Sequence, residues 1–95
     1  MEKDKKQIRG YLLVSGRVQG VAFRYYSQKI AKKLGITGWV RNCMDGKVEI
    51  VAEGEEEKVN QFIDWCHKGP KNAIVKKVEY TREKFKGEFL FFNIR

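Results

Sequence analysis

The chain has 95 residues, enough for a single domain with one modest core but too few for two domains. Hydrophobic residues make up 42% of the chain and charged residues 34%, which is typical of a globular protein and excludes a disordered or fibrous one. No uncharged run approaches the roughly 20 apolar residues that cross a bilayer, and the charged start "MEKDKKQ" is unlike a secretory signal. We therefore expect a cytoplasmic protein without a membrane partner.

The charge balance favours anionic partners. Twenty Lys and Arg residues against twelve Asp and Glu residues give a net charge of +8. Nucleic acid, a phosphorylated metabolite or an acidic surface would each fit this charge. The lysines are dispersed along the chain, so the charge alone does not choose among these partners.

Residues 1–7 are predicted to form a flexible N-terminal tail before a single domain of residues 8–95. The domain begins with a strand over residues 8–14, in which alternate residues share one side of a sheet. A glycine-bracketed loop follows the strand. Apolar residues then recur at helical spacing, at Phe23, Tyr26, Ile30 and Leu34. Gly35 would end this helix.

The second half of the chain continues with two strands, "ITGWVRN" (36–42) and "KVEIVAE" (47–53), around a turn at Asp45-Gly46. Three glutamates at 55–57 suit the start of a second helix, which "KGP" (68–70) ends. The core-facing stripe of this helix consists of Val59, Phe62, Ile63 and Cys66. Two further strands, "AIVKKVEYT" (73–81) and "EFLFFNIR" (88–95), are predicted to join through a turn near Gly87.

The order β-α-β-β-α-β, with one more strand at the end, predicts an α+β fold of the ferredoxin-like class. In this two-layer sandwich, two helices pack on one face of an antiparallel sheet. The fold alone assigns no function, because the same architecture serves many activities.

Arg24 lies where the first helix is predicted to begin, in the stretch "GRVQGVAFR" (16–24). A helix N-terminus carries unpaired N–H groups and a partial positive charge, so an arginine there is misplaced by ~0.3–1 kcal/mol. If an anion binds at the helix end, the arginine there becomes favourable, because it attracts the same anion. The guanidinium offers a planar set of donors that suits phosphate. Gly16 and Gly20 would let the backbone bend so that successive N–H groups surround the anion. From this pattern alone, pairing of Arg24 with a surface carboxylate remains an equal alternative.

Few other residues suit metal binding or nucleophilic catalysis. Cys43 and Cys66 are not part of a CxxC motif, so we expect no metal site, and we expect no cofactor. We expect both cysteines to be buried thiols, with a disulfide between them as the alternative. His67, the only histidine, lies near the predicted end of the second helix, where it would compensate the negative pole of the helix dipole. Asn42 precedes a turn, where an asparagine often serves only to form an Asx-turn or to adopt an unusual backbone angle.

Five segments together resemble the acylphosphatase family along nearly the whole chain. They are "GRVQGVAFR" (16–24), "GWVRN" (38–42), "DGKVEIVAEG" (45–54), "GP" (69–70) and "FNIR" (92–95). Members of this family have the βαββαβ fold and hydrolyse the mixed anhydride of a carboxylate and phosphate. The resemblance implies acyl phosphates as substrates, including acetyl phosphate, carbamoyl phosphate and 1,3-bisphosphoglycerate.

The resemblance also assigns roles to residues of this chain. Arg24 would bind the phosphoryl group, and Asn42 would orient the attacking water. The loop would bind phosphate through backbone N–H groups, chiefly those of residues 18–21, and it comprises Gly16, Arg17, Val18, Gln19, Gly20, Val21 and Ala22. Many members have glycine at the position of Ala22, so the fine geometry of the loop is expected to differ slightly from theirs.

The chemistry fits this residue set. A carboxylate is a good leaving group, and phosphoryl transfer asks the protein mainly for positioning and charge stabilisation. We therefore expect in-line attack of water on phosphorus without a metal or a covalent intermediate. The predicted partner is a small-molecule acyl phosphate, with phosphate or sulfate as a bound anion, and the protein is expected to be a monomer.

Other functions fit the sequence less well. An RNA-recognition module shares this topology, but its base-stacking strand would correspond to "KVEIVAE", which has no aromatic residue and two glutamates. A metal-carrying ferredoxin-like domain would need a CxxC motif. Acylphosphatase-like domains also occur at the N-terminus of larger hydrogenase-maturation carbamoyltransferases. Because this chain ends soon after the fold is complete, we expect the stand-alone enzyme.

Overall fold

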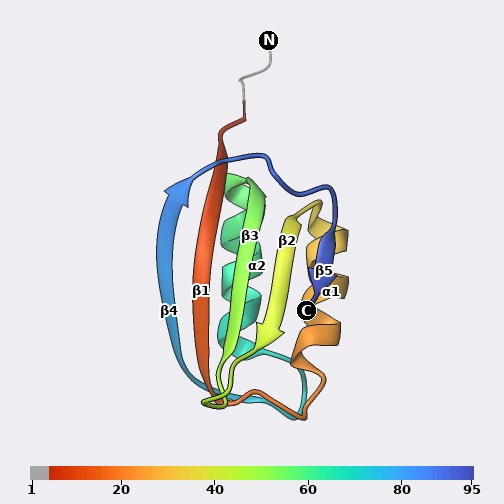
Figure 1. The fold of residues 1–95 in the computed structure, drawn as a ribbon, viewed down its shortest axis with the longest axis vertical. Coiled ribbons are helices and arrows are strands. Elements are labelled where there is room, and N and C mark those ends of the chain that lie inside the picture. The colour runs from red at the N-terminus through yellow and green to blue at the C-terminus, as the bar shows by residue number, and fades with distance from the viewer. Residues whose placement is uncertain (1–4) are drawn as a thin grey trace.

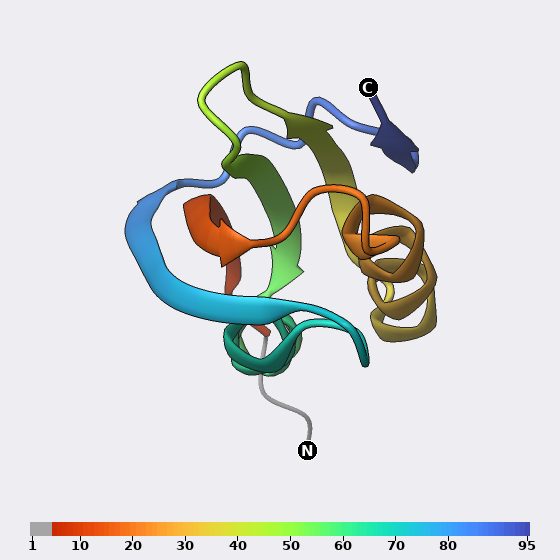
Figure 2. The same ribbon diagram turned by 90° about the horizontal axis from the view of Figure 1, so that it is seen from below.

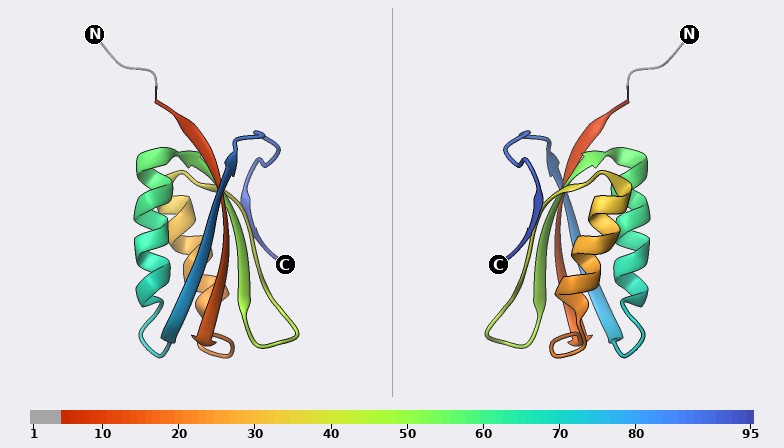
Figure 3. Two further views of the ribbon diagram at one scale, coloured as in Figure 1. Left: turned by 90° about the vertical axis from the view of Figure 1, so that its left-hand side faces the viewer. Right: turned by 90° about the vertical axis from the view of Figure 1, so that its right-hand side faces the viewer.

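A computed structural model describes residues 5–95 of the protein, so residues 1–4 of the predicted tail lie outside the described part. The elements follow in the order β1 (Gln7–Arg17), α1 (Phe23–Leu34), β2 (Thr37–Asn42), β3 (Val48–Glu55), α2 (Glu56–Lys68), β4 (Ile74–Lys84) and β5 (Phe92–Ile94). The five strands form one sheet in the order β4-β1-β3-β2-β5 (Figure 1). The predicted α+β ferredoxin-like sandwich is confirmed, since both helices cover one face of the sheet (Figure 3).

The C-terminal part of the sheet differs from the prediction in two respects. β5 pairs in parallel with β2, so the sheet is mixed and not wholly antiparallel. β4 and β5 lie at opposite edges of the sheet, and residues 85–91 cross its end instead of forming a turn between neighbouring strands (Figure 1). The predicted strand 88–95 is therefore reduced to three residues, because only these find a partner on β2.

Both helices match the sequence pattern closely. α1 ends at Leu34, and Gly35 follows in the left-handed conformation at φ 73°, a conformation that glycine adopts without steric strain. In α2 the whole predicted stripe is buried, from Val59 to Cys66. These side chains belong to the same core as alternate residues of β1 and β3, such as Leu12, Val14, Val48 and Ile50, which share one face of the sheet. The resulting core fixes the start of α1 relative to the ends of β1 and β2.

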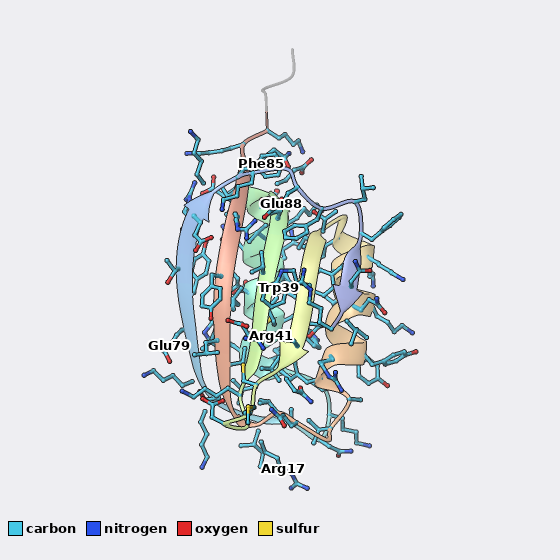
Figure 4. The ribbon with its side chains drawn as sticks, viewed as in Figure 1. Arg17, Trp39, Arg41, Glu79, Phe85 and Glu88 are labelled. Carbon is cyan, nitrogen blue, oxygen red and sulfur yellow. The ribbon has the colours of Figure 1, made fainter. Side chains whose placement is uncertain are left out.

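A charged cluster holds the crossing segment on the other face of the sheet. The Glu53 side chain is fully buried, and one of its oxygens accepts backbone N–H groups of Lys86 at 2.8 Å and Gly87 at 3.3 Å. Arg9 lies 3.4 Å from the same oxygen and also donates at 2.5 Å to Glu88, a residue of the crossing segment that Figure 4 labels. A buried charge is tolerated when it is paired and hydrogen-bonded in this way. The cluster thus fixes the path that leads the chain to β5.

Candidate active site

The segment between β1 and α1 is the loop of residues 18–22, which lies at the lower end of the molecule in Figure 1 and faces the viewer in Figure 2. Its backbone includes two left-handed residues, Gly20 at φ 75° and Ala22 at φ 63°. Ala22 is the one non-glycine residue with a positive φ within residues 5–95. Between β1 and α1, no backbone N–H of residues 18–22 donates a hydrogen bond to another described residue. The loop therefore presents unused donors.

The start of α1 adds further donors and a positive pole. Ala22 occupies the N-cap position, where its side chain offers no hydrogen bond to the first-turn N–H groups. The first turn also contains no acidic residue. Because neither a cap nor a carboxylate compensates the helix end, it retains its partial positive charge and its affinity for an anion.

The Arg24 guanidinium lies at this same helix end. None of the ion pairs among residues 5–95 involves Arg24, so no Asp or Glu side chain in this part of the chain is its partner. Its Nη1 instead donates to the main-chain oxygen of Arg95 at 3.0 Å. This bond leaves other guanidinium donors available, because an arginine carries five N–H groups.

Asn42 ends β2 opposite Val48 of β3. It lies two residues beyond the buried Val40, and since side chains alternate along a strand, it faces the helix-covered side of the sheet. The local turn bond is made by Asp45, whose carboxylate accepts the Lys47 N–H, and no hydrogen bond of the Asn42 side chain occurs within residues 5–95. The Asx-turn alternative therefore does not describe Asn42.

One pocket of about 210 Å3 brings these features together. Its lining residues come from four places in the chain, namely Val18, Gly20 and Ala22 of the loop, Phe23, Arg24 and Tyr25 of α1, Asn42 of β2 and Ile94 of β5. Five of the residues predicted for the site thus lie around the same space. The sequence did not predict Tyr25 and Ile94 as lining residues. Each is a single exposed side chain, and such a residue belongs to no periodic sequence pattern that would mark it.

The remaining four predicted loop residues are not among the residues that line the pocket. Gly16 lies at a β-bulge on β1, where an added Cβ would come within 2.2 Å of the Ile74 carbonyl oxygen. Arg17 ends β1, and its exposed side chain extends away below the loop (Figure 4). Val21 packs against the hydrophobic core, and Gln19 binds the neighbouring hairpin.

The Gln19 side chain connects the loop to the β2–β3 turn. Its amide group donates to the carbonyl oxygens of Cys43 at 2.8 Å and Lys47 at 2.9 Å. Cys43 directly follows Asn42, and its own N–H donates to the Lys47 carbonyl at 2.8 Å. The two bonds therefore fix the distance between the loop and the strand end that carries Asn42.

Gly69 supports the start of α1 from below. It adopts φ 70°, and a Cβ at this position would lie 2.9 Å from the Phe23 ring. Phe23 is the first residue of α1 and is buried against Trp65 of α2, with ring centroids 5.3 Å apart. Glycine thus permits the close packing that sets the helix end beside the loop.

The other candidate residues take structural positions. His67 Nδ1 lies 3.0 Å from the Ile63 carbonyl oxygen, within the last turn of α2. Both cysteines are free thiols, but only Cys66 is buried as expected, whereas Cys43 is partly exposed. Burial raises the pKa of both thiols, which keeps them in the unreactive protonated form.

Residues 5–95 contain no group of three or more His, Cys, Asp or Glu residues arranged to hold a metal ion. No helix in this range is long and apolar enough to span a membrane.

We predict that Gln19→Ala lowers the free energy of unfolding by about 1–2 kcal/mol, because it removes two hydrogen bonds of the loop. Chemical denaturation monitored by tryptophan fluorescence measures this change. Gln61→Ala is the matched control, since Gln61 is an exposed residue of α2. Equal stability of Gln19→Ala and wild type would show that these two bonds do not anchor the loop.

Comparisons with known proteins identify the family of this chain. The acylphosphatase family model matches residues 10–94. An acylphosphatase from Syntrophobacter fumaroxidans is 51% identical over 86 residues, which make up 90% of this chain and 89% of that protein. The crystal structure of the acylphosphatase from Bacillus subtilis has a TM-score of 0.90 at 36% identity, and the match covers 93% of this chain and 98% of that one. The structure of T. kodakarensis HypF has a TM-score of 0.80 at 32% identity, but the match covers only 12% of that chain against 93% of this one. The predicted resemblance is thus confirmed, and the chain belongs to the acylphosphatase family of enzymes.

Proposed function

We propose that the protein hydrolyses acyl phosphates to a carboxylate and inorganic phosphate, with the phosphoryl group held by loop N–H groups and Arg24. The observation that carries this proposal is the single pocket that the loop, the start of α1 and Asn42 share. Inorganic phosphate or sulfate is the anion expected to bind there in the absence of substrate. We further propose that the enzyme acts as a cytoplasmic monomer.

The electrostatics of the pocket favour a dianionic group. Unpaired loop N–H groups, an uncapped helix end and the Arg24 guanidinium all contribute positive potential. No carboxylate side chain is among the pocket's lining residues to oppose it. Fixed donors of the site would therefore replace the water molecules that hydrate a phosphoryl group. The same donors would stabilise the charge that develops on the phosphoryl oxygens during transfer.

In the proposed mechanism, water attacks phosphorus in line with the bond to the acyl oxygen. The side-chain amide of Asn42 would orient this water, since its carbonyl oxygen can accept a hydrogen bond from the water. A new P–O bond forms from the water oxygen, and the bond between phosphorus and the acyl oxygen breaks with its electron pair leaving on the carboxylate. The water proton passes to a phosphate oxygen. A carboxylate leaves without protonation, so the reaction needs no general acid from the protein.

The open face of the sheet argues against the competing function of binding RNA. Base-stacking modules of this topology leave aromatic side chains free on the central strands. Here the hydroxyl of Tyr11 donates to Glu49, and the Arg95 guanidinium lies 4.5 Å from the Trp39 ring centroid. The Tyr11 hydroxyl and the Trp39 ring therefore already have partners, and the central strand β3 contributes Glu49 and Glu53 to this face.

We predict that wild type hydrolyses benzoyl phosphate in the presence of a chelator, while Arg24→Ala lowers kcat/KM by about 100- to 1000-fold or more. Asn42→Ala should lower it by about 100-fold, because the attacking water loses its orientation. Arg41→Ala is the matched control, since Arg41 precedes Asn42 but faces the opposite side of the sheet and pairs with Glu49 (Figure 4). Circular dichroism checks that each variant is folded. A folded wild type that releases no phosphate would contradict the proposal.

The position of attack gives a separate prediction. When hydrolysis runs in water enriched in oxygen-18, the label should appear in inorganic phosphate and not in the carboxylate. Mass spectrometry of both products measures its distribution. Label in the carboxylate would mean attack on the acyl carbon, and the role given to the phosphate loop would then be wrong.

A further inference from the structure

We infer that the exposed ring of Tyr25 and the side chain of Ile94 form a subsite for the acyl group of the substrate. This inference rests on the proposed function and adds a preference for acyl phosphates with an aromatic or large apolar acyl group over acetyl phosphate. The phosphate-binding residues do not determine this preference, because they contact only the phosphate end of the substrate.

The lining of the pocket divides into two chemically different parts. Gly20, Arg24 and Asn42 are lining residues with polar groups suited to phosphate, whereas the lining residues Phe23, Tyr25 and Ile94 have large apolar side chains. Phe23 is 1% exposed and belongs to the core, but Tyr25 is 51% exposed and Ile94 is 40% exposed. When the phosphoryl group occupies the polar part, the acyl group attached to it extends toward the apolar surface that is still open.

Both side chains are held in place before a substrate arrives. The Tyr25 ring meets the Tyr26 ring edge to face, with centroids 5.0 Å apart, and the Lys29 ammonium lies 5.6 Å from the Tyr25 centroid. Ile94 is fixed by the parallel pairing of β5 with β2, where it lies opposite Val40. Because the surface is preorganised, little conformational entropy is lost when an acyl group binds to it.

The size of the acyl group decides how much this surface contributes. A benzoyl ring can stack against Tyr25 and cover Ile94, whereas the methyl group of acetyl phosphate removes far less apolar area from water. The acyl group keeps these contacts in both the bound substrate and the transition state. Such uniform binding lowers KM and leaves kcat nearly unchanged.

The test compares benzoyl phosphate with acetyl phosphate in wild type, Tyr25→Ala, Tyr25→Phe and Phe91→Ala. We expect Tyr25→Ala to raise KM for benzoyl phosphate roughly 2- to 12-fold, the range that corresponds to one aromatic contact, with kcat preserved. KM for acetyl phosphate should change less than that. Tyr25→Phe keeps the ring and should retain the wild-type ratio, as should Phe91→Ala, in which an exposed aromatic residue outside the pocket is lost.

Each outcome supports or overturns a definite statement. A fall in kcat/KM by the same factor for both substrates in Tyr25→Ala would overturn the acyl subsite and leave the proposed function intact. An unchanged KM for benzoyl phosphate in this variant would do the same. Absence of hydrolysis of either substrate by folded wild type would overturn the proposed function, and the subsite with it.

Discussion

The uncompensated positive end of α1 is the feature on which the site depends. A helix start without a capping side chain or an acidic residue is less stable than a capped one, and Arg24 adds a further positive charge there. Within residues 5–95, Arg24 pairs with no carboxylate side chain. An anionic ligand would be attracted by both the partial positive charge of the helix end and the charge of Arg24, so that they would favour its binding. In this account, the helix end is left unstabilised because the substrate stabilises it.

The surrounding structure keeps the donors close together although they repel one another. Gln19 fixes the loop to the turn after Asn42, and Gly69 allows the chain to pack tightly against Phe23 beneath the helix end. On the far side, Arg9 and Glu53 hold the crossing segment that leads to β5, whose last residue lines the pocket. Contacts distant in sequence therefore position a site whose polar groups would separate in a flexible peptide.

The sequence predicted those parts that have a local signature. α1 and α2 were predicted because periodic apolar residues and terminal glycines mark them. The assignment of Arg24 and Asn42 to one site followed from the family resemblance. The prediction of β5 was wrong in the length of the strand and in its partner. Its pairing with β2 is parallel and joins residues far apart in sequence, and the aromatic run before it shows no clear alternation. The burial of Glu53 could not be predicted from the sequence, since an acid in a strand usually faces water and the groups that bind Glu53, on Arg9 and residues 86–87, are distant in sequence.

The most direct test of the account is a titration of the isotopically labelled protein with inorganic phosphate, followed by the amide resonances of the backbone. We predict saturable shifts concentrated at residues 18–22 and the first turn of α1, and much weaker shifts at the same phosphate concentrations in Arg24→Ala. Both results would place the anion on the loop, the helix end and Arg24 together. Shifts spread over the surface lysines, or confined to another part of the sheet, would contradict the existence of a phosphate site at the start of α1.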